Sequence, residues 1–494
     1  MASGMTEGRG ALRRTARSLT LPTLLFGVAA VLSRVLGFRY LFYTDHWHLL
    51  SPDLLAHDAA RSLVLLHSQP PLLNLTAALI YKFSALISVP PARVAEFFFM
   101  LLGWGTTCLL FDLVQRIRSS KFLSIAAVVL LLTDPAFWFY QNTFFYSMML
   151  LFLFTASSWF LHRFLRTETV GSFSGFAFST VLTTLLRSLY APIWAVITMA
   201  AALLSRFSRR TARPRGRSSP AWTVLAAALL LLFAWPVKNL VVFGQFTFTS
   251  WTCYNLRAGR SEQRRELRSY LRNGVVAEHV TAELEAFKRK HGIAAAPAIE
   301  NVTKADGSRN WNHYIFLVEN RGAWTRAWKY ASSRPMRFLS ESSANYWRWS
   351  APTYRDSYTN ANEGPESAAY QDYAALHRRI FFGGWGRRAV GRIFALRTHG
   401  GRLLRAGSAF GAVIVPLLLV GLGWRVWKGS PVGWEWERSY IAILLFWVSW
   451  NLIVPAISDG VEASRMRFPM TTVLIVLGAL VLPLSGRAKS DSRG

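Results

Sequence analysis

Long apolar segments alternate with short basic ones along almost the whole chain. They lie near residues 20–38, 94–114, 122–139, 144–162, 220–243, 408–427, 437–457 and 467–485. Each is long enough to cross the roughly 30 Å hydrocarbon core of a bilayer as an α-helix. A further apolar stretch, 172–205, is too long for one helix and contains Arg187 and Pro192, so we expect two spans that meet at a turn. The pattern predicts an all-α polytopic membrane protein.

The basic loops predict how these spans are oriented. Short Lys- and Arg-containing loops mark the cytoplasmic side, and they occur at 115–121, 162–167 and 206–217. With a cytoplasmic N-terminus, the first span runs to the outside, so only one further span can cross between His67 and Gln115. Two apolar segments, 71–89 and 94–114, occupy that interval. The segment 71–89 is the more polar of the two because it contains Asn74 and Lys82. We therefore expect 71–89 to be a juxtamembrane or re-entrant helix on the outer side, and both termini to be cytoplasmic.

This topology divides the chain into three parts. Residues 1–243 form an N-terminal transmembrane module of seven spans, whose first outer loop is 39–93. Residues 244–407 form an extracytoplasmic domain, and 408–494 form three C-terminal transmembrane helices with a basic tail. The outer domain is expected to be mostly helical, with helices at 262–273, 277–291 and 311–332 and a loop-like aromatic stretch at 345–354.

Composition narrows the possible partners. The hydrophobic fraction is 52% and the mean hydropathy is +0.24, as in polytopic membrane proteins. The net charge is +30, but Lys and Arg lie in loops beside apolar helices, which favours membrane orientation over nucleic-acid binding. The outer domain is basic and faces lipid headgroups, so we expect anionic lipids among the partners and no nucleic acid. Cys108 and Cys253 allow neither a disulfide framework nor a zinc motif.

Acidic and histidine residues are concentrated in the first outer loop, within Tyr43–Pro71. The chain has only 26 acidic residues against 56 basic ones, so carboxylates gathered at a membrane boundary indicate a functional site. The alternative is a solvated loop between two helices. The loop holds Asp45, Asp53, Asp58, His46, His48, His57 and His67.

Two further outer-side segments carry candidate chemistry. Asp134 begins a short turn between two spans, within Thr133–Asn142. The segment Asp459–Pro469, immediately before the last span, contains Glu462, Arg465 and Arg467. Lys238, at the outer end of the seventh span, is a further candidate for binding phosphate. Arginines at such positions also serve as membrane anchors whose charged heads reach the headgroups.

Two of these segments resemble the glycosyltransferase-C superfamily of integral membrane enzymes, in particular the bacterial relatives of protein O-mannosyltransferase and lipid A aminoarabinose transferase. The family's His-Pro-Pro-Leu type motif is matched by His67-Ser-Gln-Pro-Pro-Leu72. Its Glu-x-x-Arg-x-Arg-Phe-Pro type sequence is matched at Glu462–Pro469. The family's module of seven spans followed by an outer domain agrees with the topology above, whereas 244–407 matches no family motif.

The resemblance implies transfer of a hexosyl or pentosyl unit from a polyprenyl-phosphate-linked donor to an acceptor, on the outer face of the cytoplasmic membrane. Asp45 is the expected catalytic base, because it lies just after the first span. The other expected site residues bind substrate, with the arginines on the phosphate and Glu462 orienting one of them. They are His67, Gln69, Asp134, Lys238, Glu462, Arg465 and Arg467.

The sequence departs from the family in its acidic residues. Family members often carry paired acids in the first loop, whereas Asp45 is followed by His46 and Trp47. Hard cations need several oxygen ligands, so we expect a reaction without a metal ion or other cofactor.

Two other classes of function remain open. A transporter or flippase of lipid-linked sugars would also need many spans, but transporters place charges near the middle of the membrane and show inverted repeats. A non-catalytic partner in envelope assembly would fit the small number of acidic residues. The sequence leaves open which sugar, which acceptor and which oligomeric state.

Overall fold

The computed structural model describes residues 2–42, 46–207, 220–255, 263–350, 372–373, 376–377, 415–428, 435–457 and 466–481. Within these residues the chain is almost entirely helical. The described part contains no β-strand, only isolated bridges that pair Leu41 with Thr143 and Thr303 with Arg309. The predicted all-α architecture is confirmed.

The apolar helices form one bundle. Four of the described helices are long and apolar enough to cross a membrane. The number is five if one bent pair of helices is counted as a single span. These are α5 (Pro91–Arg118), α8 (Tyr146–Thr167), α11 (Ala221–Phe243), α22 (Glu435–Ile457) and the pair α6 (Lys121–Leu132) with α7 (Pro135–Gln141). Around them lie α1 (Ala2–Val35), α9 (Val170–Leu186), α10 (Pro192–Phe207), α21 (Val415–Lys428), the 3₁₀ turn η3 (Phe468–Met470) and α24 (Thr471–Val481). The chain is a multi-pass membrane protein.

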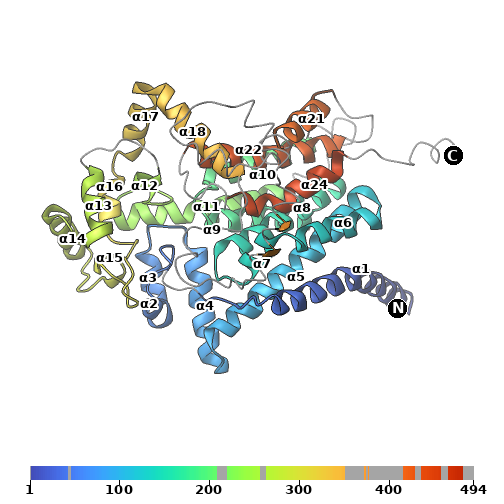
Figure 1. Cartoon of the computed structure of the whole chain (residues 1–494), viewed down its shortest axis with the longest axis horizontal. Coiled ribbons are helices and arrows are strands. Elements are labelled where there is room, and N and C mark those ends of the chain that lie inside the picture. The colour runs from blue at the N-terminus through green and yellow to red at the C-terminus, as the bar shows by residue number, and fades with distance from the viewer. Residues whose placement is uncertain are drawn as a thin grey trace.

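Shorter helices gather at one end of this bundle. They are α2 (Pro52–His57), α3 (Ala59–Val64), α12 (Thr252–Asn255), α13 (Gln263–Asn273), α14 (Glu278–Lys290), α15 (Pro297–Glu300) and α16 (Ile315–Asn320). The N-terminal end of α1 lies at the opposite end of the molecule (Figure 1). Two further helices, α17 (Ala323–Ser333) and α18 (Pro335–Ser350), lead from this group back to α22. The described parts of the first outer loop and of residues 244–320 therefore form one layer at the end of the bundle (Figure 1).

Helix α8 lies at the centre of the bundle and is buried along most of its length. Hydroxyl groups connect it to three neighbours. Ser157 donates to Ser179 of α9 (2.7 Å), Thr155 donates to Thr472 of α24 (2.8 Å), and Ser158 is hydrogen-bonded to Tyr440 of α22 (2.6 Å). Small hydroxyl residues allow close approach of helices and satisfy one another in an apolar environment.

Two predictions about the spans have different outcomes. The predicted break in 172–205 is confirmed, since α9 ends at Leu186 and α10 begins at Pro192. The apolar segment 122–139 is not one continuous helix, and its break falls at Asp134, where a turn was expected. Helices α6 and α7 meet at a bend of 64°, because Asp134 accepts a hydrogen bond from the Ala136 amide (2.9 Å) and starts a new helix with Pro135 at its first position.

The outer helices follow the predicted pattern only in part. The helices expected at 262–273 and 277–291 are α13 and α14. The helix expected at 311–332 is instead divided into α16 and α17, because Gly322 adopts a left-handed conformation (φ +70°). The stretch 345–350 is helical rather than loop-like, as part of α18, and 351–354 lie outside the described residues. No glycine or proline interrupts α18 after Pro335, so its aromatic residues continue the helix.

Helix α4 (Leu72–Ile87) occupies the segment expected not to cross. Its 16 residues span roughly 24 Å, less than the hydrocarbon core. Leu75, Leu79 and Phe83 form an exposed apolar face. In Figure 1 the helix leads from the α2–α3 end of the bundle to the start of α5. That α4 stays on the outer side remains a prediction.

Two serines that are matched in structure test this topology. Ser88 and Ser119 are both exposed and end α4 and α5 in left-handed conformations (φ 54° and 53°). In a background lacking Cys108 and Cys253, Ser88→Cys should react with a membrane-impermeant maleimide in intact cells. Ser119→Cys should react only after permeabilisation. The reverse result would show that α4 crosses the membrane.

Candidate functional site

The first outer loop is anchored at its start against the junction of α7 and α8. The Leu41 amide donates to the Asn142 carbonyl (2.8 Å), and the Phe144 amide donates to the Leu41 carbonyl (2.9 Å). Asp45, the expected catalytic base, lies outside the described residues. The described residues begin again at His46. The surroundings of Asp45 are therefore described by the residues that follow it in the chain.

Those residues, His46 to His48, belong to an aromatic cluster in which both histidines are buried. The His46 ring stacks on Trp47 (4.1 Å between centroids) and on His48 (4.9 Å), and it meets the edge of Phe145 (4.4 Å). The amide of Asn74 in α4 holds the backbone from both sides, because it donates to the His48 carbonyl and accepts from the Leu50 amide. The loop after Asp45 is therefore rigidly positioned.

A buried arginine lies at the centre of this region. Arg187 is the residue that ends α9, and it is only 7% exposed. Its Nη1 group donates to His48 Nε2 (2.8 Å), and its guanidinium lies 4.3 Å from the centre of the Tyr146 ring. Its Nη2 group lies 3.9 Å from the sulfur of Met466. Arginine is always a donor, so His48 accepts through Nε2 and is neutral.

Sequence reasoning used Arg187 only as an interruption of an apolar run. The signal that could have identified it is present in the sequence, since an ionisable residue within membrane-spanning segments is a functional-site hypothesis by default. His48 and Tyr146 carried no comparable signal. They belong to this cluster only because the folded chain brings residues 48, 146 and 187 together.

The His67 motif is held by residues of the predicted outer domain. His67 is fully buried, and its Nδ1 is hydrogen-bonded to Ser250 Oγ (2.8 Å). The backbone amides of His67 and Ser68 both donate to Asn312 Oδ1 (2.9 and 3.0 Å). Burial lowers the pKa of His67 well below its ordinary value, and Lys238 and His313 lower it further. A neutral, buried His67 positions the loop from within.

Gln69, two residues further on, lies beside the Arg187 cluster. It is buried, and its Oε1 lies 3.5 Å from the hydroxyl of Ser188. The motif that the sequence singled out thus reaches the residue next to Arg187.

Lys238 anchors the same loop from α11. Its ammonium group donates to the carbonyls of Val64 (3.1 Å) and Leu66, just before the His67 motif, and it lies 3.8 Å from the centre of the Trp235 ring. These contacts give Lys238 a clear structural role in holding the end of α3.

Asp134 and Arg467 form a second polar pair. Besides capping α7, the Asp134 carboxylate interacts electrostatically with Arg467 and His377. Arg467 is buried and directly follows Met466, which contacts Arg187. Phe468 packs on Tyr140 of α7, with 4.6 Å between ring centres. Glu462 and Arg465 lie outside the described residues.

Among the described residues, no group of three or more His, Cys, Asp or Glu side chains could hold a metal ion. The polar groups brought together here are instead a guanidinium, neutral imidazoles and an amide.

Comparison with known proteins adds little to this geometry. No protein-family model and no curated protein matches the chain. Among solved structures it is similar to the crystal structure of ArnT from Cupriavidus metallidurans bound to undecaprenyl phosphate, with 12% identity over 90% of this chain and 77% of that one. The TM-score is 0.35, too low for any conclusion. Function must therefore be inferred from this chain's own residues.

A double-mutant cycle tests the Arg187–His48 contact. Arg187→Met should leave a buried acceptor on His48 unpaired, and His48→Phe should remove a partner of the guanidinium; each should lower stability in detergent. The double variant should lose less unfolding free energy than the two single variants lose in sum. The expected difference is about 1–3 kcal/mol, measured by denaturant unfolding. Strictly additive effects would show that the two side chains do not interact.

Proposed function

We propose that the protein is a membrane glycosyltransferase that moves a sugar from a polyprenyl-phosphate-linked donor to an acceptor on the outer face of the cytoplasmic membrane. One observation carries the proposal. Segments that are distant in sequence meet around Arg187: the loop that follows Asp45, the His67–Gln69 motif, and Met466 beside Arg467. Two of these are the segments that carry the resemblance to the glycosyltransferase-C superfamily.

Arg187 and Arg467 would bind the donor phosphate. A guanidinium binds phosphate oxygens through two parallel hydrogen bonds, and Arg187 lies where the chain turns between two apolar helices. A lipid-linked donor needs this arrangement, with the polyprenyl chain among the helices and the phosphate at their end. In this scheme Asp134 orients Arg467, and Glu462 and Arg465 complete the phosphate site.

Asp45 would act as the general base. It removes the proton of the acceptor hydroxyl as that oxygen attacks the anomeric carbon. The bond from the anomeric carbon to the phosphate oxygen breaks, and polyprenyl phosphate leaves with the electron pair. Arginine side chains stabilise the charge that develops on the leaving phosphate.

The remaining predicted site residues fall into two groups, those that would contact substrate and those that hold the loop. Gln69 lies beside Ser188 and would contact the transferred sugar or its phosphate. His67 and Lys238 are occupied by contacts that hold the loop, so we assign them positioning roles. Residues 1–243 would be the catalytic module and 244–407 the outer domain that closes over the first loop.

Exchange of Asp45 tests the proposal. Asp45→Asn preserves size but cannot accept the proton, so turnover should fall about 10²–10⁴-fold while protein level stays normal. Asp58→Asn, an exposed acid of the same loop, is the matched control and should keep activity. The readout is mass analysis of envelope glycans and glycolipids from cells that carry each variant or lack the protein.

Two outcomes would count against this scheme. If glycans and glycolipids are the same with and without the protein, the transporter or assembly-partner alternatives replace the enzyme. If product depends on the protein but Asp45→Asn remains fully active, the base is a different residue.

A further inference from the structure

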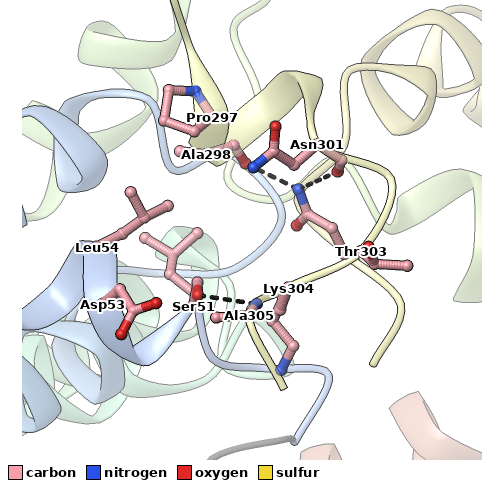
Figure 2. Close-up of a pocket in the computed structure, with 11 residues that line it drawn as sticks. Ser51, Asp53, Leu54, Pro297, Ala298, Asn301, Thr303, Lys304 and Ala305 are labelled. Atoms are coloured by element: carbon pink, nitrogen blue, oxygen red, sulfur yellow. Dashed lines mark hydrogen bonds between the residues drawn. The ribbon is translucent and has the colours of Figure 1, made fainter. Parts of the chain in front are cut away.

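A polar cavity lies between the first outer loop and the outer domain (Figure 2). Its volume is about 250 Å³. Residues 50–54, at the start of α2, form one wall. The other wall is formed by α15 and the turn that follows it, residues 297–305, together with Asn310. None of the predicted site residues that the structure describes lines it.

Three polar side chains at this cavity make no hydrogen bond to the described protein. The Asp53 carboxylate comes from α2, and the Asn301 amide and Thr303 hydroxyl come from the facing turn. All three are exposed to solvent. Together they present hydrogen-bond acceptors and donors from both walls to a bound molecule.

The walls that carry these groups are fixed by other residues. Asn310 donates to the carbonyls of Asn301 (2.8 Å) and Ala298 (3.2 Å), and Ser51 Oγ accepts from the Ala305 amide (3.3 Å). The Ser51–Ala305 bond connects the two walls, and the bonds of Asn310 hold the turn in place. The three free side chains are therefore presented on a preformed frame, which reduces the entropic cost of binding.

Apolar atoms complete the lining. Leu54 lies on the loop side, and Pro297 and Ala298 lie on the domain side. A cavity with a few convergent polar groups and apolar walls is typical of small-molecule sites. A sugar ring presents hydroxyls at its rim, which pair with carboxylate, amide and hydroxyl groups, and C–H groups on its faces, which pack on apolar atoms.

The cavity is connected to the Arg187 region by one buried side chain. Lys304 lines the cavity, and its ammonium group donates to the carbonyl of His46 (3.1 Å). His46 directly follows Asp45 and stacks on His48, the partner of Arg187. A molecule bound in the cavity would thus lie beside the segment that directly follows the expected base.

We propose that this cavity binds a saccharide unit of the acceptor. This inference rests on the proposed function, since it assigns the acceptor's chemical class and its place beside the segment that follows Asp45. Asp53 is then a binding residue, distinct in role from the base.

Saturation-transfer difference NMR tests the inference directly. Methyl glycosides of mannose, glucose and arabinose are added at millimolar concentration to purified protein in detergent. At least one should receive saturation from wild-type protein. Asp53→Asn and Asn301→Ala should weaken its binding about tenfold, as expected for one lost hydrogen bond to a charged or amide group. Asp58→Asn does not change the cavity lining and should bind as wild type does.

Absence of signal for every glycoside, or a signal unaffected by Asp53→Asn and Asn301→Ala, would overturn the inference. The two proposals fail in different ways. A protein that alters envelope glycans but binds no glycoside here would keep its proposed function and take its acceptor elsewhere. If the protein binds glycosides through Asp53 but alters no glycan, it is a saccharide-binding protein without transfer activity. Unchanged thermal unfolding of each variant shows that the fold is intact.

Discussion

The buried guanidinium of Arg187 is the constraint on which the outer end of the bundle depends. A charge removed from water is costly unless hydrogen bonds and polarisable groups surround it. Here the guanidinium donates a hydrogen bond to the neutral imidazole of His48 and contacts the face of the Tyr146 ring and the sulfur of Met466. These come from the first outer loop, α8 and the segment before α24, so satisfying one side chain fixes three parts of the chain relative to one another.

Residues of the predicted outer domain stabilise the same arrangement. Asn312 and Ser250 hold the backbone and ring of His67, and Lys304 holds the carbonyl of His46. From the membrane side, Lys238 holds the end of α3. A long loop between a first helix and α4 would be mobile alone. With these contacts it becomes a rigid surface, and rigid positioning is what a catalytic group needs.

The sequence predicted the apolar helices better than the contacts between them. Hydropathy and one Arg–Pro interruption were sufficient to place the break between α9 and α10. The turn at Asp134 was expected, but the helix α7 that it starts was not, because this short helix is as apolar as the span before it. Motif residues His67 and Gln69 were identified from their pattern, but the role of Arg187 was not. Its partners are 139 and 279 residues away in the chain, and no local pattern encodes such contacts.

The most direct test of the account is where the lipid donor's phosphate binds. A structure of the protein in lipid nanodiscs with a bound polyprenyl phosphate would locate it. We predict that the phosphate lies within hydrogen-bonding distance of the Arg187 guanidinium, beside His48 and Gln69, with the polyprenyl chain along the helices. A phosphate bound at the opposite end of the bundle, or one that leaves the surroundings of Arg187 empty, would contradict the central claim.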